Sequence, residues 1–168
     1  MLLENHKKTH TKPLPKATLC FLLKNNSLCL AMKKRGFGQG KWNGVGGKKE
    51  DNETIVEAAI RETEEEIMVT PQEMELTAII SFYHIKDTIP GLEVYTFVSR
   101  KWIGEPTETE EMKPQWFDFN EIPYNNMWPD DSFWLPKLLA GEKFTGEFLF
   151  KDSVILEHSL KNVSTLDL

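Results

Sequence analysis

The spacing of acidic residues in one short segment constrains this chain more than any other feature. The fixed positions of the segment are Gly47, Glu53, Arg61, Glu62, Glu65 and Glu66. Glu65 and Glu66 follow Glu62 by three and four residues, a spacing that places the three carboxylates on one face of an α-helix. Like charges at this spacing repel, so the arrangement costs stability unless a cation lies beside it. From the residues alone, a solvated acidic helix face and a cation-binding face both remain open.

Two segments have the signals of helices. The first is predicted at about Thr54–Ile67, where Thr54 and Glu57 form a capping box that satisfies two backbone amides at the helix start. The second is predicted at about Ser132–Ala140, with Gly141 as the residue that ends it.

Seven apolar, β-prone stretches lie on both sides of the first helix. They are Ala17–Leu23, Ser27–Met32, Leu76–Tyr83, Leu92–Ser99, Gln115–Phe119, Glu147–Phe150 and Val154–Glu157. A polar turn at Lys24–Asn26 predicts that the first two form a hairpin. Six glycines between residues 36 and 47 indicate a loop that passes close to another part of the molecule. Strands around a central helix predict one α/β or α+β domain with a sandwich architecture.

The composition excludes several classes of protein. A net charge of −6 gives no basic footprint for a nucleic acid polymer, and no apolar run reaches the roughly 18 residues that span a bilayer. The N-terminus has no apolar core or cleavage site of a secretory signal. Cys20 and Cys29 belong to no C-x-x-C pair, so we expect buried free thiols in a reducing compartment such as the cytoplasm.

The length of 168 residues fits a single domain with a hydrophobic core. We expect a flexible N-terminal tail at residues 1–16, one domain at residues 17–163 and a C-terminal tail at residues 164–168. A monomer is the default expectation.

The segment GKKEDNETIVEAAIRETEEEIMV resembles the signature of the Nudix hydrolases, G-x5-E-x7-R-E-U-x-E-E-x-G-U, in which U is a bulky aliphatic residue. The matching residues are Gly47, Glu53, Arg61, Glu62, Glu65, Glu66 and Val69. Thr63 stands where the signature has the aliphatic residue, and Met68 replaces the glycine after the helix. Such a glycine usually adopts the left-handed conformation, so Met68 costs about 1 kcal/mol or the helix ends differently.

The resemblance implies a Nudix-type α/β/α sandwich with a mixed central sheet, in which the helix at about 54–67 is catalytic. It implies Mg²⁺ as the cofactor, with Mn²⁺ as a substitute, because hard cations prefer carboxylate oxygens. The implied catalytic residues are Glu53, Arg61, Glu62, Glu65 and Glu66, and the implied metal ligands are Gly46, Glu62, Glu65, Glu66 and Glu111. One of these glutamates would act as general base towards the attacking water.

Two further stretches resemble the branch of the family that acts on oxidised purine nucleoside triphosphates. They are MKKRGFGQGKWNGVGGK, from Met32 to Lys48, and EEMKPQWFDFNEIPYNNMWPDDSFWLP, from Glu110 to Pro136, within a similarity that covers about Ala17 to Val163. The substrate-binding residues that this resemblance implies are Thr18, Lys33, Phe37, Asn43, Phe82, Trp128, Asp130 and Asp131.

The residue types fit recognition of a purine. Trp128 offers an aromatic face for stacking, worth about 1–3 kcal/mol per base. Two adjacent buried acids resist joint ionisation, so one of Asp130 and Asp131 could accept a hydrogen bond from the purine edge while the other donates one. Alternatives remain open for each residue alone: an aspartate as helix cap, Trp128 as core packing and Asn43 as a turn residue.

The combined expectation is an enzyme that cuts oxidised purine nucleoside triphosphates such as 8-oxo-dGTP to the monophosphate and pyrophosphate. Its purpose would be sanitation of the nucleotide pool and prevention of DNA damage. The alternative within enzymes is a Nudix hydrolase of another modified nucleotide, for example a methylated purine. The alternative outside them is a nucleotide-binding Nudix module with weak catalysis, which Thr63 and Met68 keep open.

Overall fold

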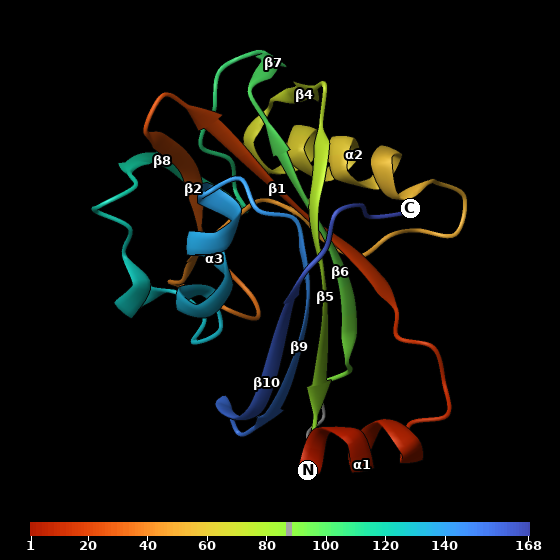
Figure 1. Ribbon diagram of the computed structural model, residues 1–168. Coiled ribbons are helices and arrows are strands. Elements are labelled where there is room, and N and C mark those ends of the chain that lie inside the picture. The colour runs from red at the N-terminus through yellow and green to blue at the C-terminus, as the bar shows by residue number, and fades with distance from the viewer. Residues whose placement is uncertain (87–88) are drawn as a thin grey trace.

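The computed structural model describes residues 1–86 and 89–168 and has an α/β/α architecture (Figure 1). Its helices are α1 (Leu2–Thr9), α2 (Ile55–Ile67) and α3 (Asp131–Leu139), with a 3₁₀ helix, η1, at Tyr124–Asn126. Its strands are β1 (Lys16–Lys24), β2 (Ser27–Lys33), β3 (Trp42–Asn43), β4 (Thr70–Gln72), β5 (Glu75–His84), β6 (Leu92–Ser99), β7 (Lys101–Ile103), β8 (Met112–Asp118), β9 (Phe144–Lys151) and β10 (Val154–Asn162). The predicted fold class is confirmed.

The central sheet is mixed, as predicted. Its strand order is β10-β9-β5-β6-β1-β2-β3, with β8 also paired to β2, while β4 and β7 form a separate two-stranded sheet. The pairs β1–β6 and β5–β9 are parallel, and the other neighbours are antiparallel. Lys24 pairs with Ser27, which confirms the predicted hairpin between β1 and β2.

Alternation along β1 explains why the sheet has a helix on each face. Successive side chains of a strand point to opposite faces, and Phe21 packs edge-on against Trp134 of α3, with ring centroids 5.9 Å apart. Cys20 and Leu22 point the other way and share a buried cluster with Ile67 of α2. The central strands are therefore buried on both sides, and α2 and α3 lie on opposite faces of the sheet (Figure 1).

The start of α2 is the predicted capping box. The Thr54 hydroxyl accepts a hydrogen bond from the Glu57 backbone amide at 3.1 Å, and the Glu57 carboxylate accepts one from the Thr54 amide at 2.9 Å. Thr63, at the position of the expected aliphatic residue, is fully buried, and its hydroxyl donates to the Ala59 carbonyl at 2.7 Å. The polar atom is satisfied within the helix, so Thr63 packs in the core without an unpaired group.

The end of α2 is strained at the position of the missing glycine. Met68 caps the helix in the left-handed conformation, with φ 62° and ψ 34°, and its amide donates to the Glu64 carbonyl at 3.0 Å. Its side chain remains exposed. The helix thus ends as a glycine-terminated helix would, and Met68 bears the steric cost of its Cβ in this conformation.

The N-terminal segment differs from the expected flexible tail. Leu2–Thr9 forms α1, whose Leu3 side chain is buried and whose Leu3 amide donates to the Glu157 carboxylate of β10. Lys7 forms an ion pair with Glu147 of β9 at 2.6 Å. A short helix of weak intrinsic propensity is held here by tertiary contacts, which the local sequence does not reveal.

All seven predicted strands are present, several of them longer than expected. The short strands β3, β4 and β7 were not predicted, because two or three residues carry no alternation pattern. Cys20 and Cys29 are buried free thiols, as expected, and burial raises the pKa of each to about 12. None of the helices in the described residues is long and apolar enough to cross a membrane.

We expect Met68→Gly to raise the free energy of unfolding by about 1 kcal/mol, because glycine adopts the left-handed conformation without a Cβ penalty. Urea denaturation measures the change. Met68→Ala is the matched control: it shortens the same exposed side chain but keeps the Cβ, so it should give no gain. Equal stabilisation by both substitutions would show that the backbone conformation is not the cause.

Candidate active site

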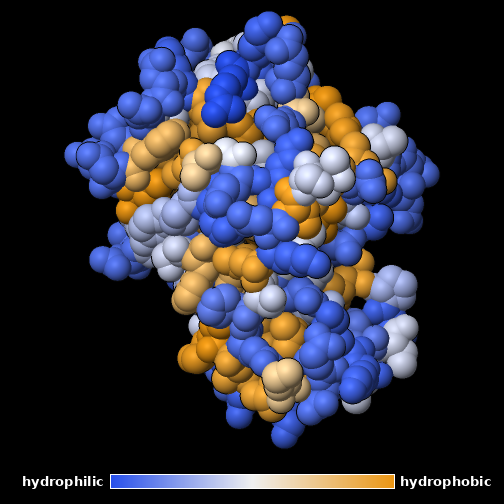
Figure 2. Space-filling view, viewed as in Figure 1, coloured by the Kyte–Doolittle hydropathy of each residue, from blue (hydrophilic) through white to orange (hydrophobic). Residues whose placement is uncertain are grey.

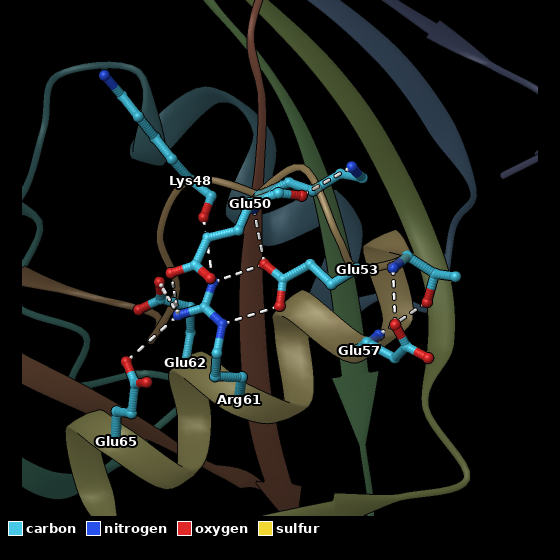
Figure 3. Close-up of polar contacts among 9 residues, drawn as sticks. Lys48, Glu50, Glu53, Glu57, Arg61, Glu62 and Glu65 are labelled. Atoms are coloured by element: carbon cyan, nitrogen blue, oxygen red, sulfur yellow. Dashed lines mark hydrogen bonds and ion pairs between the residues drawn. The ribbon is translucent and has the colours of Figure 1, made fainter.

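The exposed face of α2 is organised around the guanidinium group of Arg61 (Figure 3). Arg61 donates from Nε and Nη2 to the two carboxylate oxygens of Glu53, at 2.8 and 2.7 Å. Its Nη1 donates to Glu62 at 2.8 Å and to Glu65 at 3.3 Å, and its Nη2 also donates to the Lys48 carbonyl at 3.2 Å. One cation therefore holds three of the predicted carboxylates together and ties the helix to the preceding loop.

This network shifts the ionisation of its members. Hydrogen bonds from Arg61 lower the pKa of Glu53 to about 2, and the same bonds raise the pKa of Arg61 itself. Burial acts in the opposite direction on Glu62, whose pKa it raises. Glu53 is thus a charged partner that orients Arg61. Glu62 lies in a partly buried position, where its ionised form is unfavourable unless a cation is nearby.

Two glycines allow the loop before the helix to approach the carboxylates. A Cβ at Gly47 would lie 2.6 Å from the carboxylate carbon of Glu62, and one at Gly46 would lie 1.8 Å from the Thr18 carbonyl oxygen. The Gly46 amide donates to the Glu66 carboxylate at 3.2 Å. Any larger residue would displace the loop or the acid, so this close approach explains the glycine of the signature.

Glu66 connects the helix to a cavity. The cavity has a volume of about 270 Å³, and Glu66, Gly46 and Gly47 form one part of its wall. All eight predicted substrate-binding residues also line it: Thr18, Lys33, Phe37, Asn43, Phe82, Trp128, Asp130 and Asp131. Burial raises the pKa of Glu66 to about 8. The fold therefore joins residues from β1, β2, β5, α2 and the segment before α3 in one site.

Trp128 forms one wall of the cavity. Its ring stacks on Phe37, with centroids 5.0 Å apart, and the Lys41 ammonium lies 5.1 Å from its centroid. A Cβ at Gly38, where φ is +83°, would come within 3.1 Å of the indole. The glycine-rich loop thus passes close to the indole and fixes its position.

Asp130 and Asp131 are both almost completely buried. Asp130 accepts a hydrogen bond from the Trp134 indole at 2.8 Å, and Asp131 accepts one from the Trp128 backbone amide at 3.1 Å. Asp130 holds the N-cap position of α3, but its side chain makes no capping hydrogen bond. Burial raises the pKa of both carboxyls, and the charge of Asp130 raises that of Asp131 further. The pair therefore favours a state with at least one proton.

The fold and this site agree with what sequence comparison finds. Residues 13–138 match the NUDIX domain. The chain belongs to the Nudix family.

Similar proteins come from animals and bacteria. The chain is 44% identical over 150 residues to the oxidized purine nucleoside triphosphate hydrolase of Mus musculus, covering 88% of this chain and 95% of that protein. It is 43% identical over 150 residues to the protein of the same name from Danio rerio, covering 89% and 96%. The crystal structure of the mutator MutT protein from Bacillus halodurans superimposes with a TM-score of 0.78 at 26% identity, covering 88% of this chain and 97% of that one.

Nudix hydrolases generally use divalent metals, yet among residues 1–86 and 89–168 no three acidic, His or Cys side chains converge on one point. That Gly46, Glu62, Glu65, Glu66 and Glu111 hold the metal therefore stays a prediction. Two arginines bind carboxylates of this set: Arg61 donates to Glu62 and Glu65, and Arg35 donates to Glu111 from Nε at 2.9 Å and from Nη2. The carboxylates of this Nudix site nevertheless suit a hard divalent cation in donor type and in negative charge.

Lys41, His84 and Trp134 are among the residues of the cavity wall that were not predicted. Trp134 had a signal, since it follows Asp130 by four residues on a helix and can reach its carboxylate. Lys41 offsets part of the rise in the pKa of Asp131 through its charge. His84 stacks on Phe150 at 5.5 Å, a contact between strands that no local pattern reveals.

The lowered pKa of Glu53 predicts an acid-dependent contribution to stability. Its ionised form stabilises the folded state above the ordinary pKa of 4.5, and this contribution is lost as the pH falls towards 2. Arg61→Gln removes the cause of the shift. We therefore expect the difference in urea midpoint between wild type and Arg61→Gln to be largest above pH 4.5 and to shrink as the pH falls towards 2.

Lys101→Gln is the control, because it removes an exposed ion pair with Glu73 at 3.0 Å. Such pairs contribute little at any pH. A difference for Arg61→Gln that stays constant over the whole acidic range would contradict the assigned link between Arg61 and Glu53.

Proposed function

We propose that this Nudix enzyme hydrolyses oxidised purine nucleoside triphosphates, such as 8-oxo-dGTP, to the monophosphate and pyrophosphate. The observation that carries the proposal is that Trp128, Asp130 and Asp131 line the same cavity as Glu66 of α2. A base held at one end of this cavity would extend its phosphates towards the carboxylate face of the helix. The names of the relatives from Mus musculus and Danio rerio support the same substrate class.

The base end of the cavity combines stacking with two hydrogen-bonding acids. Trp128 supplies the aromatic face. A proton shared between Asp130 and Asp131 leaves one carboxyl as donor and the other as acceptor, so the pair can match a purine edge that offers both functions. Asn43, whose side-chain oxygen accepts from the Gly44 amide at 2.8 Å, keeps its amide NH₂ to donate to the other side of the base.

The phosphate end depends on charge neutralisation. Glu62, Glu65 and Glu66, with the Gly46 carbonyl and Glu111, would hold Mg²⁺, or Mn²⁺ in its place. The ion neutralises phosphate charge when bound. Lys33 lines the cavity and acts on Glu66 by its charge, so its ammonium group would lie beside the phosphates. One of the helix carboxylates accepts the proton of the attacking water.

Arg61 and Glu53 act as positioning residues in this proposal. Their bidentate pair fixes the guanidinium, which in turn orients Glu62 and Glu65. The enzyme would work as a cytoplasmic monomer on free nucleotides and remove oxidised precursors before they enter DNA.

The direct test is incubation with Mg²⁺ and a panel of oxidised, methylated and unmodified nucleoside triphosphates, with pyrophosphate and monophosphate measured. We expect the oxidised purines to have the highest kcat/KM. Glu65→Gln should lower kcat by about a hundredfold or more while nucleotide binding is retained, because it removes a carboxylate charge at the reacting phosphates.

Glu64→Gln is the matched control on the same helix, since the Glu64 carboxylate accepts from the Thr70 hydroxyl at 2.8 Å, away from the arginine network. It should leave kcat nearly unchanged. Absence of turnover of every oxidised purine would refute the proposed substrate class, and preference for a methylated purine would replace it.

The base site makes a second prediction, which couples selectivity to stability. The raised pKa of Asp130, about 6, means that the folded protein retains a proton that the unfolded chain releases. The stability that this bound proton contributes is thus fully present below about pH 4, and it is lost as the pH rises through 6. Asp130→Asn cannot ionise, so above pH 6 it should be more stable than wild type by about 1–3 kcal/mol yet discriminate less between oxidised and unmodified purines.

Thermal denaturation and kcat/KM ratios measure the two effects. Asp118→Asn is the control, because Asp118 is exposed and accepts a hydrogen bond from the Ser27 hydroxyl at 2.9 Å that asparagine can also accept. Unchanged selectivity in Asp130→Asn would limit the role of Asp130 to its hydrogen bond with Trp134.

A further inference from the structure

A second cavity lies behind the first, on the opposite face of the same strands. It has a volume of about 310 Å³, and it is lined by Lys7, His10, Lys12, Pro13, Leu14, Lys16, Ser81, Tyr83 and Glu93. Along β5, Ser81 and Tyr83 face this cavity, whereas the alternate residues Phe82 and His84 face the purine cavity. Because side chains alternate along a strand, the two cavities are separated by the thickness of the sheet.

The floor of the second cavity is a row of side chains across three strands. Lys16 of β1 pairs in register with Glu93 of β6, and Glu93 pairs with Ser81 of β5. The roof is the segment that links α1 to β1. Figure 1 shows this segment standing clear of the sheet, and Figure 2 shows it as a white to pale blue arm at the lower right, with a notch between it and the body.

The cavity is basic in a chain that is acidic. Between residues 5 and 49 there is no Asp or Glu, although the net charge of the chain is −6. Three lysines and one histidine line the cavity, against one carboxylate, Glu93. That carboxylate accepts a hydrogen bond from the Tyr95 hydroxyl at 2.8 Å. Such a local excess of positive charge attracts an anion and offsets the repulsion of the whole molecule.

Two of the lysines are available to a ligand. Lys7 is held by Glu147 at 2.6 Å and by Glu4 at 3.5 Å. In the part of the chain that the structure describes, Lys12 and Lys16 form no ion pair, and the Lys16 ammonium lies 5.4 Å from the centroid of the Tyr95 ring. Ammonium groups that form no ion pair and that line a hollow of this size are suited to a small anion.

The geometry points to a second ligand site, which binds the phosphate group of a small phosphorylated molecule. Lys12 and Lys16 would supply the charge, and the hydroxyls of Ser81 and Tyr83 would donate hydrogen bonds to phosphate oxygens. The imidazole of His10 closes the wall beside Tyr83, with ring centroids 6.1 Å apart. Pyrophosphate, inorganic phosphate and a nucleoside monophosphate share this chemistry.

This site is distinct from the catalytic one in its position and in the part of the chain that supplies its residues. Four of its nine lining residues precede residue 14, and α1 lies outside the NUDIX match at residues 13–138. The contacts that hold α1 on β9 and β10 are what close the cavity. A ligand bound here would therefore stabilise the docked position of α1 without occupying the purine cavity.

The test is an NMR titration of the full chain with EDTA present, using pyrophosphate, inorganic phosphate and dGMP in separate arms. We expect saturable shifts of the His10 ring signals and of the Ser81 and Lys16 amides, with the tightest Kd for the ligand that places most charge in the cavity. Saturation with dGMP alone would identify a nucleotide as the source of the phosphate, and saturation in all arms would identify the phosphate group itself.

Charge-removing variants locate the site. Lys12→Gln with Lys16→Gln should raise the Kd about tenfold or more, whereas Lys24→Gln, at the opposite end of β1, should leave it unchanged. His10→Gln tests the contribution of the wall separately from that of the lysines. It removes the imidazole ring without changing a residue of the sheet, so it should weaken binding less than the two lysine substitutions. Shifts confined to Thr18, Lys33 and Asn43, shifts that never saturate, or equal effects of the two lysine variants would overturn the proposal.

Discussion

The bidentate pair between Arg61 and Glu53 is the interaction on which the rest of the site depends. Helix α2 carries several carboxylates on one face, and their mutual repulsion would weaken the helix without a cation. Arg61 supplies that cation from within the helix and bonds to Glu53, Glu62 and Glu65 together (Figure 3). Its further bond to the Lys48 carbonyl fixes the loop whose glycines approach Glu62 and Glu66. The carboxylate face of α2 is thus organised around one guanidinium.

The burial of acidic side chains is the second feature that shapes the site. Glu66, Asp130 and Asp131 line one cavity, and burial raises the pKa of each. A chain selected for stability alone would not place three carboxyls there, because each is costly to ionise away from water. Unfavourable electrostatics of this kind concentrate where a protein binds or transforms a ligand. In the proposed function, buried acids would serve to bind the base at one end of the cavity and to act at the phosphates at the other end.

Much of this arrangement was predictable because it is local. The spacing of Glu62, Glu65 and Glu66 and the Thr54 capping box depend only on helix geometry, and both are present in the structure. What could not be predicted depends on distant partners. The docking of α1 uses Glu147 and Glu157 from the C-terminal hairpin, and the hydrogen bond from Arg35 to Glu111 joins residues more than seventy positions apart in the sequence. The left-handed cap at Met68 was foreseen as one of two outcomes.

The protonated state of Glu66 has a thermodynamic consequence for ligand binding. With a pKa of about 8, this carboxyl holds a proton over much of the neutral range, and a cation can coordinate it only as the carboxylate. With Glu66 as a metal ligand, as proposed, metal binding would be coupled to proton release, so the apparent metal affinity would rise with pH, and the heat measured by calorimetry would depend on the ionisation enthalpy of the buffer. One half-buried side chain of α2 would thus link metal occupancy to the acidity of the solution.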